Sequence, residues 1–297
     1  MRLRLYAPFG VSMEAGKVPP GLYLVATPIG NLGDVTLRAL EILAGADVIA
    51  CEDTRVTRKL TERYGITTPL TAYHEHNAAE ARPKLLSRLA EGQSVALVSD
   101  AGTPLISDPG YKLVRAARET GYQVTALPGA SAVLAALTVS GVPTDRFFFE
   151  GFLPPKQAAR QKRIAVLANT QATLVLFEGG SRLASTLADL AAILGPRAAA
   201  ICRELTKLHE EVRYENLDVL ARLYANGAET RGEFVVLVAP PAEDQRADDI
   251  DALLKRALSR VSVKDAVGEV AVATGRPRRE IYQRALALTK DGENGAR

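Results

Sequence analysis

The sequence predicts an α/β protein with two successive domains. Short apolar runs at residues 22–26, 48–51 and 95–99 alternate with segments in which leucines recur at helical spacing. Strict alternation of this kind is typical of a mostly parallel, helix-covered sheet. A second alternation begins after the turn at residues 141–145, and 297 residues are enough for two domains. The expected domains are residues 21–143 and residues 144–241.

The first unit of this pattern is a strand, a glycine-rich loop, a helix and a second strand. The apolar run at 22–26 leads into the loop TPIGNLGD at residues 27–34. The second strand, at 48–51, ends on the charged sequence EDTR at residues 52–55. In open α/β sheets, ligands bind at the carboxyl edge of the strands. These charges therefore lie where a ligand is expected.

Three loops rich in glycine and proline follow predicted strands, at residues 27–34, 99–110 and 128–131. The first of these loops, residues 27–34, carries neither a GxGxxG nor a Gly-Lys-Ser/Thr pattern, so phosphate binding is not its natural interpretation. Taken singly, Asp100 and Asp108 are equally well explained as turn formers. Taken together, the loops share one edge of one sheet, and they predict a ligand site there.

Two polar motifs fall at the same edge. The motif at 52–55 is either a surface ion pair of little energetic value or a substrate contact. The motif HEHN at residues 74–77 is either a surface loop or the source of a general base or hydrogen-bond anchor. A metal site needs further ligands at suitable spacing, and the sequence shows none.

The two ends of the chain differ from the domains between them. Residues 1–20 are expected to be a disordered extension. Residues 245–297 are predicted to be helical and basic, with Ser262 capping one helix and a turn at Gly275 before the next. Most basic helices are only solvated faces, but this arrangement also suits contact with a nucleic-acid backbone. The candidate contacts are Arg276, Arg278 and Arg279.

Composition narrows the class of protein only slightly. The net charge of +3 neither requires nor excludes a nucleic-acid partner. Two distant cysteines, Cys51 and Cys202, make neither a disulfide framework nor a zinc cluster, which favours the reducing cytoplasm. No apolar run reaches the roughly 18 residues that a membrane span needs. We expect a cytoplasmic protein without a membrane partner.

An ordered set of motifs resembles one known family. The motifs are LYLVATPIGNLGDVTLRAL, CEDTR, SDAGTPLISDPG, LPGASAVLAAL and CRELTKLHEE. They resemble the tetrapyrrole-methylase superfamily of class III methyltransferases, and within it the 16S ribosomal RNA cytidine 2′-O-methyltransferases. The resemblance covers the chain from about residue 21 onward. It implies two α/β domains with S-adenosylmethionine between them, a homodimer, the small ribosomal subunit as partner, and a C-terminal extension that contacts RNA.

The resemblance also implies site residues. Residues 101–104 read AGTP where other superfamily members carry Gly-Asp-Pro, which fits the RNA-modifying branch and argues against a porphyrinogen substrate. The residues implied to contact the cofactor are Pro28, Gly30, Asp100, Gly102, Thr103, Ile106, Ser131 and Ala132, with Leu208 and Gly232 placed by approximate alignment.

Transfer of a methyl group to a ribose oxygen depends on positioning and on removal of the hydroxyl proton. His74, Glu52 and Asp53 are the candidate bases, and the sequence alone does not rank them. Arg55 can bind a phosphate in bidentate fashion, and Asn77 is a further candidate RNA contact. Two alternatives remain: a C-methyltransferase acting on a tetrapyrrole, and a non-catalytic RNA-binding protein that does not bind S-adenosylmethionine.

Overall fold

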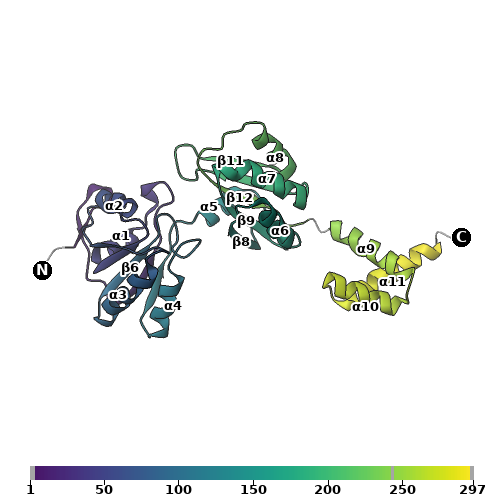
Figure 1. The fold of residues 1–297 in the computed structure, drawn as a ribbon, viewed down its shortest axis with the longest axis horizontal. Coiled ribbons are helices and arrows are strands. Elements are labelled where there is room, and N and C mark those ends of the chain that lie inside the picture. The colour runs from purple at the N-terminus through teal and green to yellow at the C-terminus, as the bar shows by residue number, and fades with distance from the viewer. Residues whose placement is uncertain (1–3, 242–243, 295–297) are drawn as a thin grey trace. The chain divides into compact units, whose positions relative to one another are not determined.

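The computed structural model describes residues 4–241 and 244–294. It divides into two compact units, Met1–Ala239 and Pro240–Arg297. The first unit contains two five-stranded sheets, each with its own order of strands. Figure 1 shows them as two α/β domains, with α5 (Ala132–Val139) between them.

The N-terminal sheet is entirely parallel, as the alternation predicts. Its strand order is β5-β4-β6-β3-β7, and all four pairings are parallel. Neighbouring residues of β4 face opposite sides, so Ile49 packs with the helix α1 while Val48 packs with α3 and α4. The elements are β3 (Gly21–Val25), η2 (Leu32–Asp34), α1 (Leu37–Gly45), β4 (Val48–Cys51), α2 (Thr54–Arg63), β5 (Leu70–Ala72), α3 (Ala78–Ala90), β6 (Ser94–Val98), α4 (Tyr111–Glu119), β7 (Val124–Leu127) and α5 (Ala132–Val139).

The second sheet differs from the first, because only β8 and β9 pair in parallel. Its order is β11-β10-β12-β9-β8, and the other three pairings are antiparallel. A short loop joins β10 to β11, and a connection of this length can only reverse the chain direction. The elements are β8 (Phe147–Phe152), α6 (Gln157–Leu167), β9 (Thr173–Gly179), α7 (Gly180–Leu194), β10 (Ala198–Arg203), β11 (Glu211–Asn216), α8 (Leu217–Ala225) and β12 (Glu233–Val238).

Helix α5 links the two layers. It follows the last strand of the first sheet, but its buried residues pack on the second sheet. Val133, Ala136 and Leu137 share one apolar cluster with Val175 of β9 and Val235 of β12. The carboxyl edge of the first sheet is thereby held against one face of the second sheet.

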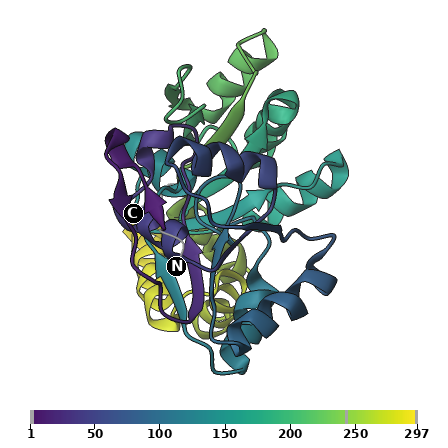
Figure 2. The same cartoon turned by 90° about the vertical axis from the view of Figure 1, so that its left-hand side faces the viewer.

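The expectation of a disordered extension at residues 1–20 is wrong for the residues that the structure describes. Strand β1 (Leu5–Tyr6) pairs with β2 (Met13–Glu14) around the short helix η1 (Pro8–Gly10), as the dark purple ribbon in Figure 2 shows. Tyr6, Ala15 and Val18 are buried in the cluster that contains α1. Strands of two residues carry no periodic signal, so only the packing shows them.

Gly45 is the point where this N-terminal segment meets α1. A Cβ atom at Gly45 would lie 2.4 Å from the carbonyl oxygen of Gly16 and 2.8 Å from Cγ2 of Val18. We expect Gly45→Ala to lower the free energy of unfolding by about 1–3 kcal/mol, because the segment must move away from the helix. Urea unfolding measures this change. Gly16→Ala is the control, since its Cβ would meet nothing within 4 Å; equal losses in both variants would contradict the packing argument.

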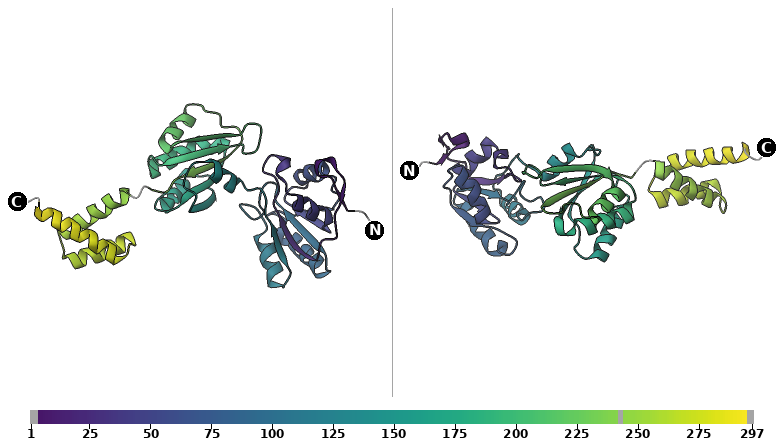
Figure 3. Two further views of the ribbon diagram at one scale, coloured as in Figure 1. Left: turned by 180° about the vertical axis from the view of Figure 1, so that it is seen from behind. Right: turned by 90° about the horizontal axis from the view of Figure 1, so that it is seen from above.

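The second unit is a small helical bundle, as the sequence predicts for this region. Its helices are α9 (Asp244–Leu258), α10 (Val263–Thr274) and α11 (Arg278–Asn294), drawn in yellow-green to yellow in Figure 3. The Ser262 hydroxyl accepts the N–H of Asp265 and caps α10, and Gly275 ends that helix with φ of 69°. Apolar residues of all three helices form one core.

Candidate functional site

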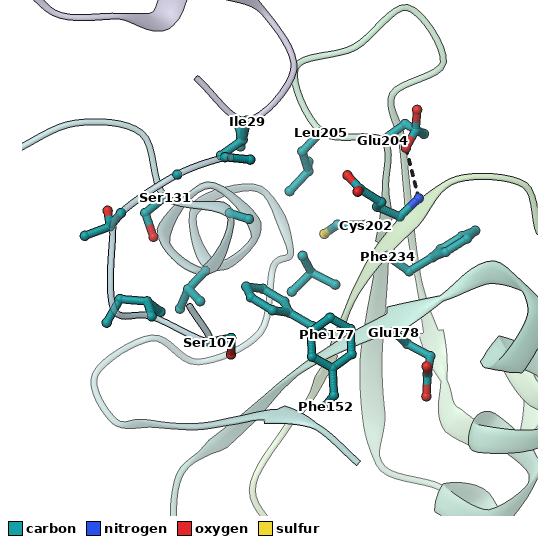
Figure 4. Close-up of a pocket in the computed structure, with 18 of the residues that line it drawn as sticks. Ile29, Ser107, Ser131, Phe152, Phe177, Glu178, Cys202, Glu204, Leu205 and Phe234 are labelled. Atoms are coloured by element: carbon teal, nitrogen blue, oxygen red, sulfur yellow. Dashed lines mark hydrogen bonds between the residues drawn. The ribbon is translucent and has the colours of Figure 1, made fainter. Parts of the chain in front are cut away.

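A cavity of about 390 Å³ lies between the carboxyl edge of the first sheet and the face of the second. Figure 4 shows its side chains converging from both domains, with Ile29 and Ser131 opposite Phe177 and Cys202. This volume is within the range of small-molecule sites. The lining residues are Ile29, Ala101, Gly102, Thr103, Ile106, Ser107, Asp108, Ser131, Ala132, Val133, Phe152, Phe177, Glu178, Gly179, Cys202, Glu204, Leu205, Lys207, Glu233, Phe234 and Val235.

Five of the residues implied to bind a cofactor line this cavity. They are Gly102, Thr103, Ile106, Ser131 and Ala132. The other five lie outside the described lining. Of these, Leu208 has 92% of its surface exposed, so its side chain points into solvent. The remaining four are Pro28, Gly30, Asp100 and Gly232.

Hydrogen bonds join the three edge loops to one another. Thr27 and Gly102 exchange both backbone hydrogen bonds at 2.9 Å. The Thr103 hydroxyl donates to the Ala130 carbonyl at 3.1 Å, and the Ser131 hydroxyl caps α5. Gly102 has φ of 78°, and a Cβ there would lie 3.3 Å from Ile29. The loops form one connected rim, and glycine at position 102 keeps it close-packed.

The loop between β10 and β11 of the second domain completes the rim of the cavity. The site residues predicted from the sequence did not include the polar side chains of this loop. The ammonium of Lys207 lies 2.8 Å from carboxylate oxygens of both Glu204 and Glu233. Although burial opposes it, these two carboxylates raise the pKa of Lys207. A Cβ at Gly30 would lie 2.4 Å from Cγ of Lys207, so Gly30 permits this close approach. The motif CRELTKLHEE was the only sequence signal for this loop.

In the polar motif after β4, residues 52–55, Asp53 and Arg55 have structural roles. The Asp53 carboxylate caps α2 by accepting the N–H of Arg55 at 2.8 Å, and it also binds the Arg55 guanidinium at 2.6 Å. These hydrogen bonds lower the pKa of Asp53 to about 2. The Asp100 carboxylate accepts the N–H of Asp53 at 3.0 Å. Burial raises the pKa of Glu52, and the charge of Asp100 acts in the same direction.

The polar motif after β5 forms a turn. The Asn77 amide oxygen accepts the N–H of His74 at 2.9 Å, while its amide nitrogen donates to the Ala72 carbonyl at 3.0 Å. The His74 Nδ1 atom is buried without a hydrogen-bond partner among the described residues. His74, Glu52 and Asp53 all follow strands of the first sheet, but none of them is among the described residues that line the cavity.

The candidate RNA contacts lie in different surroundings. The Arg55 side chain is 88% exposed and remains paired with Asp53. In the helical unit, Arg276 pairs with Glu280, and Arg278 and Arg279 are exposed. The described residues contain no group of three or more acidic, histidine or cysteine side chains able to hold a metal ion. Among them, no helix has the length and apolarity to cross a membrane.

Comparison with known proteins defines the class to which this fold and cavity belong. The profile of the tetrapyrrole (corrin/porphyrin) methylases matches residues 21–221. The chain belongs to this family, whose members are methyltransferases that use S-adenosylmethionine as their cofactor.

Closer relatives and a second profile refine this result. A protein of Mesorhizobium japonicum named ribosomal RNA small subunit methyltransferase I is 52% identical, over 95% of this chain and 97% of its own length. One of the same name from Xylella fastidiosa is 48% identical over 90% of this chain and 99% of its own length. The profile of the RsmI C-terminal HTH domain matches residues 244–289.

A solved structure has the same two-domain fold. It is uroporphyrin-III C-methyltransferase from Thermus thermophilus, complexed with S-adenyl homocysteine, with a TM-score of 0.52 and 21% identity. The match covers 74% of this chain and 97% of that one. At this identity the comparison supports the fold and not the substrate.

The cavity suits S-adenosylmethionine in its chemistry. Ile29, Val133 and Phe177 offer an apolar wall for a flat heterocycle. A Cβ at Gly179 would meet nothing within 4 Å, so the lining leaves open space at this position. Glu178 is paired with Arg182, but the carboxylates of Asp108, Glu204 and Glu233 still outnumber the single ammonium of Lys207 in the lining. A negatively charged lining favours a cationic ligand. S-adenosylmethionine is such a ligand, because its ammonium and carboxylate groups offset each other and its sulfonium remains positive.

Proposed function

We propose that this protein methylates the ribose 2′-oxygen of a cytidine in 16S ribosomal RNA, on the assembled small subunit. The main observation that supports this function is the cavity at the carboxyl edge of the first sheet. Residues of the second domain line its other side, and its charges suit a cationic cofactor. The names of the relatives, which match along almost their whole lengths, support ribosomal RNA as the substrate.

The residues that hold the cofactor in this proposal are the rim of the cavity. Gly102, Thr103, Ile106, Ser131 and Ala132 contact it directly. Pro28, Gly30 and Asp100 shape the loops behind them, and Gly232 supports the opposite wall through Glu204. Leu208, which follows Lys207 in the chain and is exposed, is proposed as a peripheral contact.

The bound cofactor supplies a methyl group made electrophilic by the attached sulfonium. The chain must therefore orient the ribose hydroxyl toward this methyl and accept the proton that the hydroxyl loses. The sequence predicts three candidates for this proton acceptor, His74, Glu52 and Asp53. Asp53 is the weakest of them, because its pKa of about 2 makes it a poor proton acceptor.

RNA contacts are proposed on both units. Arg55 is exposed beside the acidic edge and can exchange its Asp53 partner for a phosphate. Asn77 shapes the neighbouring turn. Arg276, Arg278 and Arg279 lie at the start of α11, directly after the turn that follows α10, where a basic helix end suits backbone phosphates.

The oligomeric state and the cellular location of the protein are also proposals. We infer a homodimer from the family resemblance. Exposed apolar side chains of α5 and β8, among them Leu134 and Phe147, provide a surface that a second copy can cover. A ribosomal substrate also supports a cytoplasmic location.

The test is methyl transfer from labelled S-adenosylmethionine to three acceptors offered in parallel. These are assembled small ribosomal subunits, naked 16S RNA and a porphyrinogen. We expect label in the RNA of the subunits, at a linkage that resists alkali because its 2′-oxygen is methylated. Label in the porphyrinogen alone would refute the proposal, and binding of RNA without any cofactor binding would indicate a non-catalytic protein.

A further inference from the structure

The geometry points to Asp108 as the catalytic base that removes the proton from the ribose 2′-hydroxyl. This inference rests on the proposed function and deepens it. Asp108 lies in the loop that follows β6, and it lines the cavity that we assign to the cofactor. The three bases proposed from sequence lie outside the described lining of that cavity.

The backbone around Asp108 is strained and held from several sides. Leu105 and Ser107 have φ of 74° and 63°, a region that residues other than glycine rarely adopt. A Cβ at Gly110 would lie 2.9 Å from Cδ1 of Leu105, so the loop folds closely on itself. From the second sheet, a Cβ at Gly151 would lie 3.0 Å from the Ser107 hydroxyl. Strain of this kind persists only where the surroundings impose it, and it collects at functional sites.

The surroundings of Asp108 also suit proton transfer near neutral pH. Burial raises the pKa of the Asp108 carboxyl to about 6, against a hydrogen bond from Ser99. The charges of Glu52, at the end of β4, and Asp100, at the end of β6, raise it further. A base is most effective when its pKa lies close to the working pH, because it is then both ionised and basic.

The proposed step balances in atoms and electrons. The O–H bond of the 2′-hydroxyl breaks, and its proton passes to a carboxylate oxygen of Asp108. An electron pair of the ribose oxygen forms the new O–CH₃ bond. The S–CH₃ bond breaks with its electron pair remaining on sulfur, so the sulfonium becomes a neutral thioether. Asp108 then releases its proton to solvent.

The main test is Asp108→Asn in the full-length protein, with assembled small subunits as substrate. We expect single-turnover methylation to fall by about 100-fold or more, the usual contribution of a general base. Calorimetric titration with S-adenosylmethionine is expected to show a smaller effect, a dissociation constant raised by less than about tenfold, because the carboxylates of Glu204 and Glu233 remain in the lining. The wild-type rate is expected to rise with pH through about 6 and then level off, following ionisation of the Asp108 carboxyl.

Stability provides a readout that does not depend on activity. The raised pKa means that, between about pH 4 and pH 6, folded Asp108 binds more protons than unfolded Asp108. Stability therefore falls as pH rises through this window, and the ionised carboxylate remains unfavourable above it. Asp108→Asn removes that charge, so its melting temperature at pH 8 is expected to equal or exceed that of wild type.

A second variant separates Asp108 from its neighbour Glu52. Glu52→Gln removes a charge that raises the pKa of Asp108, so the rising limb of the rate is expected to move to lower pH. If Glu52 were the base, this variant would instead lose about as much activity as we expect for Asp108→Asn.

Three results would overturn the inference while leaving the proposed function in place. They are an unchanged rate in Asp108→Asn, a parallel loss of cofactor affinity and rate, and a wild-type rate that does not vary between pH 5 and pH 7. Absence of RNA methylation by the wild-type protein would overturn the proposed function, and this inference with it.

Discussion

Replacing Arg160 with methionine is expected to lower the free energy of unfolding of the first unit by about 3–5 kcal/mol. The Arg160 guanidinium lies 2.7 Å from the Asp189 carboxylate, and their side chains are only 5% and 6% exposed. Gln161 also donates to Asp189 at 2.7 Å. Removing the arginine leaves a buried carboxylate without its countercharge, and this costs more than the intact ion pair contributes.

Thermal unfolding at pH 7.5 checks this prediction, and a fall in Tm of about 10 °C is expected for a unit of this size. The matched control is the double variant Arg160→Met/Asp189→Leu, which removes both charges and should regain most of the loss. A double variant no more stable than the single one would show that packing, and not the unpaired charge, is responsible.

The contribution of the Arg160–Asp189 ion pair to the free energy of unfolding decreases in acid. Burial opposes ionisation of Asp189, but hydrogen bonds from Gln161 and Arg160 hold its pKa below the usual value. The wild-type contribution is therefore present above about pH 4 and is lost as pH falls through the lower folded pKa. The difference in stability between Arg160→Met and wild type is expected to shrink in acid, where Asp189 takes up a proton.

Gly232→Ala is expected to weaken cofactor binding by tenfold or more. Gly232 has φ of 113°, and a Cβ there would lie 2.6 Å from Cγ of Glu204. The Glu204 carboxylate holds Lys207 at 2.8 Å and accepts the N–H of Glu233 at 2.9 Å. Glu204, Lys207 and Glu233 all line the cavity, so displacing Glu204 disturbs one whole wall.

Calorimetric titration with S-adenosylmethionine measures this effect. Gly227→Ala is the control, because Gly227 also has a positive φ, of 94°, but its Cβ would meet nothing within 4 Å. Both variants carry backbone strain, and only Gly232→Ala disturbs Glu204. Equal cofactor affinity in the two variants would show that the contact with Glu204 does not control the cavity.

Local signals in the sequence determined the elements of the first domain and the edge that carries the site. Buried parallel strands are continuous apolar runs, and glycine and proline mark the loops between them, so β3, β4 and β6 could be placed from residue type alone. Parallel strands bring their carboxyl ends to one edge, and this placed the loop of Gly102 beside that of Ser131. The family motifs then supplied the cofactor and the class of reaction.

Only the tertiary structure decided which side chains face the cavity. Asp108 was indistinguishable from a turn former in the sequence, because its raised pKa comes first from burial and then from the charges of Glu52 and Asp100, which follow separate strands. Lys207 joins the rim through carboxylates that lie on both sides of it in the sequence. The packing of residues 4–20 on α1 likewise depends on contacts with distant parts of the chain. Burial, charge pairing and close approach are properties of neighbours in space, and a local sequence pattern records neighbours along the chain only.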